Sequence, residues 1–134
     1  MPQPVGYSGK PLWQKLGLAG GQRLLLVTPP AHVDELLAGA PAGVMRLARI
    51  AEFDVALAFV TSRTALAAAL GRLLPKLADG GMIWIAWPKK ASGVITDVTE
   101  DTVREVALPM GVVDVKVCAI DATWSGLSLL RRRK

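Results

Sequence analysis

Two lysines, a serine and a glycine lie close together in the segment Trp87-Pro88-Lys89-Lys90-Ala91-Ser92-Gly93. Ammonium and hydroxyl groups in one loop can bind a phosphate or a carboxylate, and a glycine lets the backbone close around it. Side chains from a neighbouring loop, Ser62 and Arg63, could complete such a site. The candidate anion-binding residues are therefore Lys89, Lys90, Ser92, Gly93, Ser62 and Arg63.

Each part of this candidate site also has a purely structural interpretation. A Pro-Lys-Lys loop is usually a solvated loop. Ser62 is well placed to act as the N-cap of a following helix, because its hydroxyl can accept a backbone N–H. Both interpretations stay open at the level of the sequence.

Other reactive side chains are few. One cysteine, Cys118, excludes an internal disulfide, and one histidine, His32, excludes a metal site built on several histidines or cysteines. Cys118 lies in an apolar run and is expected to be a buried thiol with a raised pKa. His32 is expected to be a neutral, structural side chain. Three further polar residues are typical of a turn held by local hydrogen bonds, namely Asp121, Thr123 and Ser125.

The net charge of +5 comes almost entirely from one end of the chain, because residues 131–134 are all lysine or arginine. The remaining residues lack the diffuse basic face that tracks a phosphate backbone, so we expect a solvated basic end and no nucleic-acid partner. No uncharged apolar run approaches the roughly 20 residues of a membrane helix. The first residues carry no export signal, so we expect a cytoplasmic protein with no membrane partner.

Apolar runs predict several strands. Residues 23–28 are almost continuously apolar, as expected of a central parallel strand covered on both faces. Further strands are expected at 44–47, 54–60 and 82–87, and the runs 112–120 and 124–131 predict a hairpin. Helices are expected at 11–16, 31–38 and 100–108, with a longer one that begins at Ser62 and is kinked or ended by Pro75.

This alternation predicts an α/β fold with a single open, mostly parallel Rossmann-like sheet, helices on both faces and a C-terminal antiparallel hairpin. Residues 1–134 form one domain, with an extended N-terminal segment at 1–10 and a basic end at 131–134. The strands at 44–47 and 54–60 are separated by only about six residues, whereas adjacent parallel strands need a crossover of about a dozen.

Ligands of open α/β sheets bind outside the carboxyl ends of the strands. After the first strand the chain reads Thr28-Pro29-Pro30-Ala31-His32, without a glycine and with two prolines that lack N–H groups. A glycine-rich phosphate cradle cannot form there. Near the end of the second strand, where an acidic residue would bind ribose, the chain has Arg46 and Arg49. These features exclude ordinary NAD binding.

The layout resembles a reduced class I methyltransferase, the Rossmann-like group that uses S-adenosylmethionine and ends in a similar hairpin. Asp79-Gly80-Gly81-Met82-Ile83-Trp84 is similar to that group's turn into its fifth strand. The resemblance implies a fold, and a fold does not carry function with it.

A closer resemblance, from residue 6 to residue 132, is to an uncharacterised bacterial family known only as a domain of unknown function. It is carried by Gly6-Tyr7-Ser8-Gly9, the Trp87 to Gly93 segment, Thr96-Asp97, Lys116-Val117-Cys118-Ala119-Ile120-Asp121 and Trp124-Ser125-Gly126-Leu127. That family implies no activity, cofactor or catalytic residue.

The sequence lacks a set of acid, base and nucleophile, so we expect no catalytic residue, no metal and no cofactor. The favoured interpretation is a non-catalytic bacterial interaction or regulatory module, as a homodimer or with another protein, for which exposed tryptophans could form the interface. The alternatives are a binder of an anionic small molecule, such as a nucleotide or S-adenosylmethionine derivative, and a degenerate methyltransferase.

Overall fold

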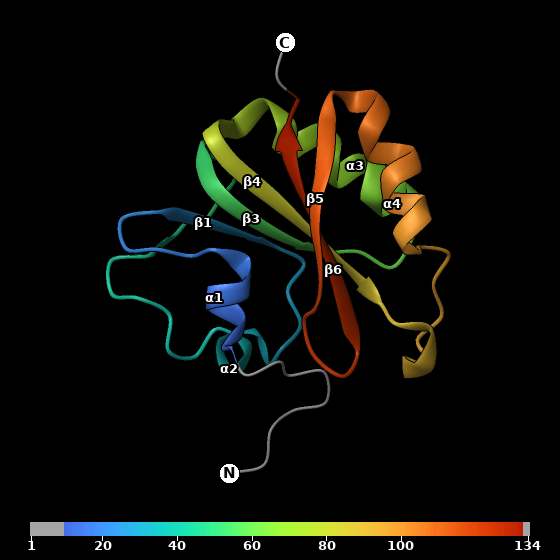
Figure 1. Cartoon of the computed structure of the whole chain (residues 1–134), viewed down its shortest axis with the longest axis horizontal. Coiled ribbons are helices and arrows are strands. Elements are labelled where there is room, and N and C mark those ends of the chain that lie inside the picture. Colours follow the sequence, from blue (N-terminus) through green and yellow to red (C-terminus); the bar gives the residue numbers. More distant parts are fainter. Residues whose placement is uncertain (1–9, 133–134) are drawn as a thin grey trace.

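Six strands form one sheet in the computed structural model, which describes residues 10–132. The strand order is β2-β1-β3-β4-β6-β5 (Figure 1). The first four strands in this order are parallel, and β6 is antiparallel to both of its neighbours. The strands are β1 (Arg23–Val27), β2 (Met45–Arg46), β3 (Phe53–Phe59), β4 (Leu77–Pro88), β5 (Val112–Ala119) and β6 (Trp124–Arg131). The predicted fold class is confirmed.

Helices cover both faces of the sheet, as predicted. α1 (Leu12–Leu16) and α2 (Val33–Leu36) pack with one core cluster, which includes Trp84 and the odd-numbered residues of β3 from Val55 on. α3 (Arg63–Leu73) and α4 (Glu100–Ala107) pack with the other, through side chains such as Leu70 and Val103. Short 3-10 turns follow α3, β4 and α4 at Leu74–Lys76, Lys90–Ser92 and Leu108–Met110. The two-sided burial explains why β3 is apolar at nearly every position.

Two predicted boundaries differ from the structure, and a third is confirmed. The helix expected at 31–38 is only α2, because His32 adopts a non-helical conformation and Gly39, with a φ of 86°, turns the chain back. The long helix ends at Leu73, directly before the 3-10 turn that contains Pro75, as predicted. The strand expected at 82–87 starts earlier, at Leu77, which pairs with the first residue of β3 before a register shift.

The short connection between β2 and β3 has a simple explanation. The two strands are not neighbours, because β1 lies between them. β2 is only two residues long and pairs with the start of β1. The chain therefore leaves β2 close to the end of the sheet at which β3 begins, and it does not have to run back along the length of a strand. Leu47 and Ile50 of this connection pack against the core on the face of α3. A loop therefore replaces the crossover helix that a longer strand would need.

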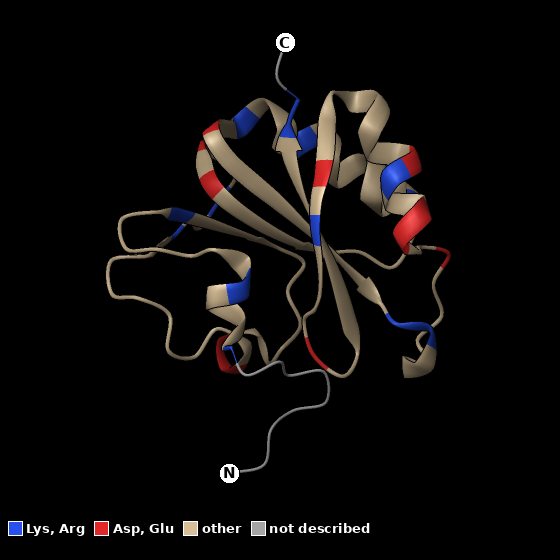
Figure 2. Ribbon diagram, in the orientation of Figure 1, with Lys and Arg blue, Asp and Glu red and all other residues tan. Residues whose placement is uncertain are grey.

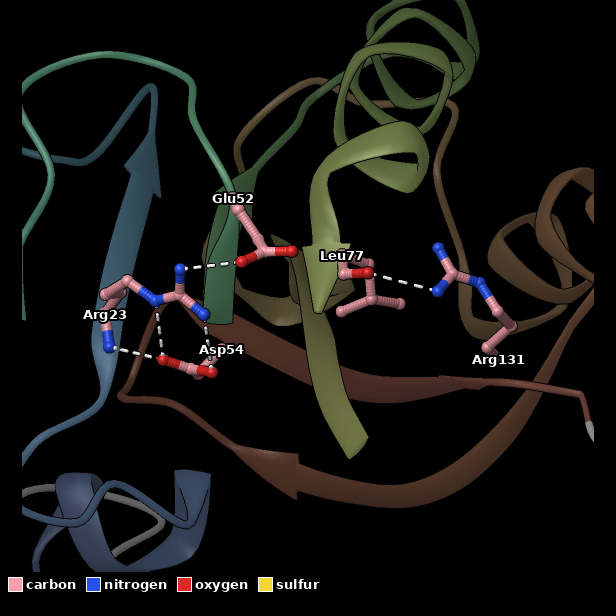
Figure 3. Close-up of polar contacts among 5 residues, drawn as sticks. All are labelled: Arg23, Glu52, Asp54, Leu77 and Arg131. Carbon is pink, nitrogen blue, oxygen red and sulfur yellow. Dashed lines mark hydrogen bonds and ion pairs between the residues drawn. The ribbon is translucent and has the colours of Figure 1, made fainter. Parts of the chain in front are cut away.

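The amino ends of β1 and β3 are joined by Arg23 and Asp54 (Figure 3). The Arg23 backbone N–H donates to Asp54 Oδ2 at 2.8 Å, and its guanidinium donates to both carboxylate oxygens at 3.1 and 3.2 Å. A further donation reaches Glu52 at 2.9 Å. The side-chain hydrogen bonds from Arg23 hold the pKa of Asp54 below its usual range. This network fixes the edge of the sheet opposite the carboxyl ends.

Part of the basic end is structural, which corrects the expectation of a solvated run. Arg131 is the last residue of β6 and donates to the carbonyl oxygens of Leu77 and Leu74 at 3.1 and 2.7 Å (Figure 3). Arg132 donates to the carbonyl of Leu108. Residues 133–134 lie outside the described part of the chain, as do residues 1–9 of the expected extended segment, including the Gly6 to Gly9 motif. None of the helices within residues 10–132 combines the length and apolarity needed to cross a bilayer.

Candidate functional site

The chain reverses its direction of travel across the sheet between β1 and β3. From β1 it moves outward to β2, and from β3 it moves the other way to β4. The carboxyl ends of these two adjacent strands therefore form a topological switch point, which is where open α/β sheets bind their ligands.

A pocket of about 300 Å³ opens at this switch point. The ends of the two strands contribute Val27 and Thr28 on one side and Phe59, Val60 and Thr61 on the other. One stripe of α3 forms a second wall, at the helical spacing of three and four residues, through Ala65, Ala68, Ala69 and Arg72. Two features leave space here. The alanine side chains of α3 are short, and a loop at residues 47–52, with no helix, connects β2 to β3 on this face of the sheet.

Trp124 forms the aromatic wall of the pocket. Its ring packs edge-on against Phe59, with centroids 5.1 Å apart and planes at 85°, a favourable geometry for an aromatic pair. Its backbone N–H donates to Asp121 Oδ1 at 2.8 Å. The first residue of β6 is therefore held by both its side chain and its backbone.

Arg72 is the only charged residue in the pocket wall. It is exposed, and within residues 10–132 its guanidinium makes no hydrogen bond or ion pair. Arg49 is also without such a partner in the described chain but does not line the pocket, whereas Arg23, for example, is paired with Asp54. The pocket thus combines apolar and aromatic walls with one guanidinium available to an anion.

His32 and Asp121 meet at the same edge of the sheet. His32 Nε2 lies 2.8 Å from Asp121 Oδ2, and Asp121 Oδ1 accepts the backbone N–H groups of Thr123 and Trp124. Burial by itself raises the pKa of Asp121, but the hydrogen bonds from His32, Trp124 and Thr123 outweigh it and lower the pKa below its usual value. The predicted local hydrogen bonds of Asp121 are confirmed, while its partner 89 residues away was not foreseen.

The sequence-predicted residues at the end of β3 have partners of their own. Ser62 is the N-cap of α3 and accepts the N–H of Ala65 at 3.0 Å, which confirms the capping interpretation. The backbone N–H of Arg63 donates to Asp97 Oδ1 at 2.7 Å, and its guanidinium lies 3.6 Å from Glu105. The Arg63 guanidinium is therefore paired with one acidic side chain, that of Glu105, while Asp97 holds the Arg63 backbone.

The loop after β4 presents its lysines near the hairpin. The Lys89 N–H donates to the carbonyl of Thr123 at 2.7 Å, and Ser92 Oγ donates back to the Lys89 carbonyl at 2.6 Å. Gly93 has a φ of 78°, which allows the loop to turn. Figure 2 shows the basic positions of this loop at the end of β4. Ser92 and Gly93 thus build the loop, and an anion on Lys89 and Lys90 stays a prediction.

Cys118 lies half-buried in β5, as expected of a core thiol. Burial raises its pKa, while Lys15 and Lys116 act in the lowering direction with less effect. No group of three or more histidine, cysteine or acidic side chains within residues 10–132 could hold a metal ion.

Sequence reasoning missed the pocket itself. The apolar stripe of the long helix indicated core packing. A second stripe beside it, three alanines and Arg72 at intervals of three and four residues, was a signal that could have indicated the pocket wall. The contribution of Trp124 had no local signal, because it depends on the hairpin lying beside β4.

Solved structures share this architecture. A ribosomal protein L11 methylase from Lactobacillus delbrueckii subsp. bulgaricus aligns over 91% of this chain and 76% of its own, with 10% identity and a TM-score of 0.60. A methyltransferase from Pyrococcus furiosus aligns over 91% and 80%, with 11% identity and a TM-score of 0.61. The magnesium protoporphyrin IX methyltransferase of Synechocystis, solved with bound S-adenosylmethionine, aligns over 90% and 74%, with 10% identity and a TM-score of 0.58.

The chain has a methyltransferase-type Rossmann-like fold. The low identities show the fold alone, in line with the layout resemblance seen in the sequence. No protein-family model and no curated protein sequence matches the chain. The resemblance to the uncharacterised bacterial family therefore stays a prediction.

The residues of this methyltransferase-type domain only partly suit S-adenosylmethionine. A planar base fits a pocket of this size with apolar and aromatic walls. The turn after β1 offers little to the charged amino-acid portion, because Pro29 and Pro30 lack N–H groups and Thr28 occupies a left-handed conformation with a φ of 51°. At the end of β2, Arg46 is paired with Asp34 where ribose would need an acceptor. The intact cofactor does not fit these residues.

Proposed function

We propose that this chain is a small-molecule-binding domain that takes an anionic, nucleotide-type ligand in the switch-point pocket. The observation that carries the proposal is Arg72, an unpaired guanidinium within the described chain, in a pocket of about 300 Å³ walled by Trp124 and alanines. This arrangement supports the alternative of a nucleotide or S-adenosylmethionine derivative more than a module that only binds other proteins.

The chemistry of the walls defines the class of ligand. Trp124 and the alanine stripe favour a flat, weakly polar group such as a nucleobase, because aromatic and apolar walls gain from covering it. Arg72 favours a phosphate or carboxylate, to which a guanidinium can donate two parallel hydrogen bonds. Thr28 and Thr61 add hydroxyl groups to the same wall. A nucleobase joined to an anionic group meets all three requirements.

The structural neighbours support binding of a nucleotide-derived molecule by a sheet of this type. They include a protein with bound S-adenosylmethionine, on the same type of sheet. The turn after β1 lacks the N–H donors that intact S-adenosylmethionine would need. Derivatives of S-adenosylmethionine therefore belong to the proposed class of ligands but are not the favoured ligand. A homodimer or a protein partner remains a prediction from the sequence, and no contact within this single chain bears on it.

Isothermal titration calorimetry with adenosine 5′-monophosphate, S-adenosylhomocysteine and S-adenosylmethionine tests the proposal. We expect adenosine monophosphate to bind most tightly of the three, and Arg72→Gln to weaken it about tenfold, which is about 1.4 kcal/mol. The matched control is Lys76→Gln, which removes a nearby exposed charge outside the pocket wall.

Filling the pocket provides a second arm of the test. Ala68→Leu adds bulk to the wall and should abolish binding, whereas Ala67→Leu adds the same bulk to an exposed α3 position that does not line the pocket. If neither adenosine monophosphate nor S-adenosylhomocysteine binds at millimolar concentration, the proposal is overturned. Equal loss in both leucine variants would also overturn it, provided that both remain folded.

A further inference from the structure

We propose that His32, positioned by Asp121, is a proton-accepting group that acts on a small molecule at the carboxyl edge of the sheet. This inference goes beyond ligand binding. It rests on the proposed function in one respect only, the identity of the molecule from which His32 accepts a proton. It revises the expectation that the chain has no catalytic residue.

The direction of the hydrogen bond defines the state of the imidazole. Asp121 is held ionised at neutral pH, since its lowered pKa lies below the usual carboxyl range. An ionised carboxylate only accepts, so the neutral ring must carry its hydrogen on Nε2 and donate it to Asp121 Oδ2. Nδ1 then presents a lone pair. Within residues 10–132, the His32 side chain makes no other hydrogen bond, and it is 42% exposed.

Asp121 is rigidly placed for this task. Its side chain is only 14% exposed, and Oδ1 accepts two backbone N–H groups, from Thr123 and Trp124. The carboxylate cannot turn away from His32 without breaking those bonds. A carboxylate that orients an imidazole and leaves its second nitrogen open is an arrangement suited to general-base chemistry.

Two connections tie this pair to the pocket. Trp124, whose N–H binds Asp121, lines the pocket wall. Thr28, four residues before His32 on the turn that leaves β1, lines it as well. An ammonium group of the bound molecule would pass a proton to His32 Nδ1, leaving a neutral amine and an imidazolium that the Asp121 carboxylate stabilises. The imidazolium would then release the proton to solvent.

The variant Asp121→Asn separates positioning from folding. Asparagine can keep its carbonyl oxygen on the N–H groups of Thr123 and Trp124, because the flipped amide would place donors against donors. Its NH2 group then faces His32 Nε2, which must become the acceptor. The hydrogen moves to Nδ1, and the lone pair available to a substrate is lost.

The first measurement is the tautomer of His32 by nitrogen-15 NMR. The chain contains one histidine, so every imidazole signal belongs to this residue. We expect the wild type to carry hydrogen on Nε2 and Asp121→Asn to carry it on Nδ1, while Asp79→Asn, at an exposed position of β4, leaves the tautomer unchanged. Hydrogen on Nδ1 in the wild type would overturn the proposal.

The second measurement is cleavage of p-nitrophenyl acetate, which needs no knowledge of the natural ligand. Nδ1 attacks the acetyl carbon, the ester C–O bond breaks to release p-nitrophenolate, and water then converts the acetylimidazole to acetate and free imidazole. We expect the rate to fall at least about tenfold in both His32→Gln and Asp121→Asn. An unchanged rate in either variant would contradict the role of this pair.

A nucleotide titration distinguishes this inference from the proposed function. If adenosine monophosphate shifts the Trp124 indole signal and also the His32 ring signals, both are supported. A shift at Trp124 with an unchanged His32 ring retains the pocket and overturns the role of His32. Without any shift at Trp124, the proposed function fails, while the tautomer and ester-cleavage results still decide whether His32 is a competent proton acceptor.

Discussion

His32 Nε2 and Asp121 Oδ2 lie 2.8 Å apart although 89 residues separate them in the chain. This bond joins the turn after β1 to the turn between β5 and β6. It crosses the carboxyl edge of the sheet, the edge at which the switch-point pocket opens. One partly buried carboxylate therefore holds both the hairpin turn and an exposed imidazole in place.

Asp121→Ala should destabilise the fold. The substitution leaves the N–H groups of Thr123 and Trp124 without their acceptor, and an unsatisfied, partly buried donor costs about 1–3 kcal/mol. Asp121→Asn keeps that acceptor and should cost less than half as much. Urea unfolding followed by tryptophan fluorescence measures both values. Equal losses would show that the carboxylate charge, rather than the turn geometry, stabilises the hairpin.

Asp54 should make the fold sensitive to acid. The side-chain hydrogen bonds from Arg23 hold the pKa of Asp54 in the folded chain below its usual value. A carboxyl group with a depressed folded pKa contributes stability above its unfolded pKa and loses it as the pH falls through the folded one. As the pH falls from about 5 to about 2, roughly the range in which carboxyl groups titrate, the free energy of unfolding of the wild type should fall more than that of Asp54→Asn. Parallel curves for the two proteins would contradict this assignment.

Two glycines should respond oppositely to alanine. A Cβ at Gly81 would lie 2.6 Å from the carbonyl oxygen of Asp54, so Gly81→Ala must separate β3 from β4 and should cost about 1–3 kcal/mol. Gly71 lies inside α3 with no atom within 4 Å of such a Cβ. Gly71→Ala should stabilise by about 0.5–1 kcal/mol. Thermal unfolding of both variants gives the comparison, and a stabilising Gly81→Ala would show that the strands do not approach this closely.

Local patterns predicted the elements well where burial is uniform. β3 is nearly as expected, because a continuous apolar run has few other conformations available in a sheet. The two hairpin strands are also nearly as expected, since β-branched residues favour strands even where, as in β5, several side chains are exposed. The cap Ser62 was also recognisable, since a side-chain oxygen at a helix start acts locally. The strand order was not recognisable from the sequence. The connection between β2 and β3 was therefore expected to be too short for neighbouring parallel strands, whereas in the structure β1 lies between them.

The candidate site was harder to predict for the same physical reason. Lys89 and Ser92 are contiguous in the chain and were visible as a motif, yet Ser92 binds the backbone of its own loop. Arg72, Trp124 and His32 come from three separate segments, and only the fold brings their environments to one edge. Residues that depend on tertiary contacts leave no periodic signal in a single sequence.

The most direct test of the account is a nitrogen-15 NMR titration of the full chain with adenosine monophosphate, read at the indole N–H signals. The four tryptophans give four such signals, and Trp124→Phe assigns the one that matters. Trp124 lines the switch-point pocket, whereas Trp87 precedes the lysine loop after β4. We predict a saturable shift at Trp124 that Arg72→Gln weakens. A shift confined to Trp87, or no shift at millimolar nucleotide, would contradict binding in this pocket.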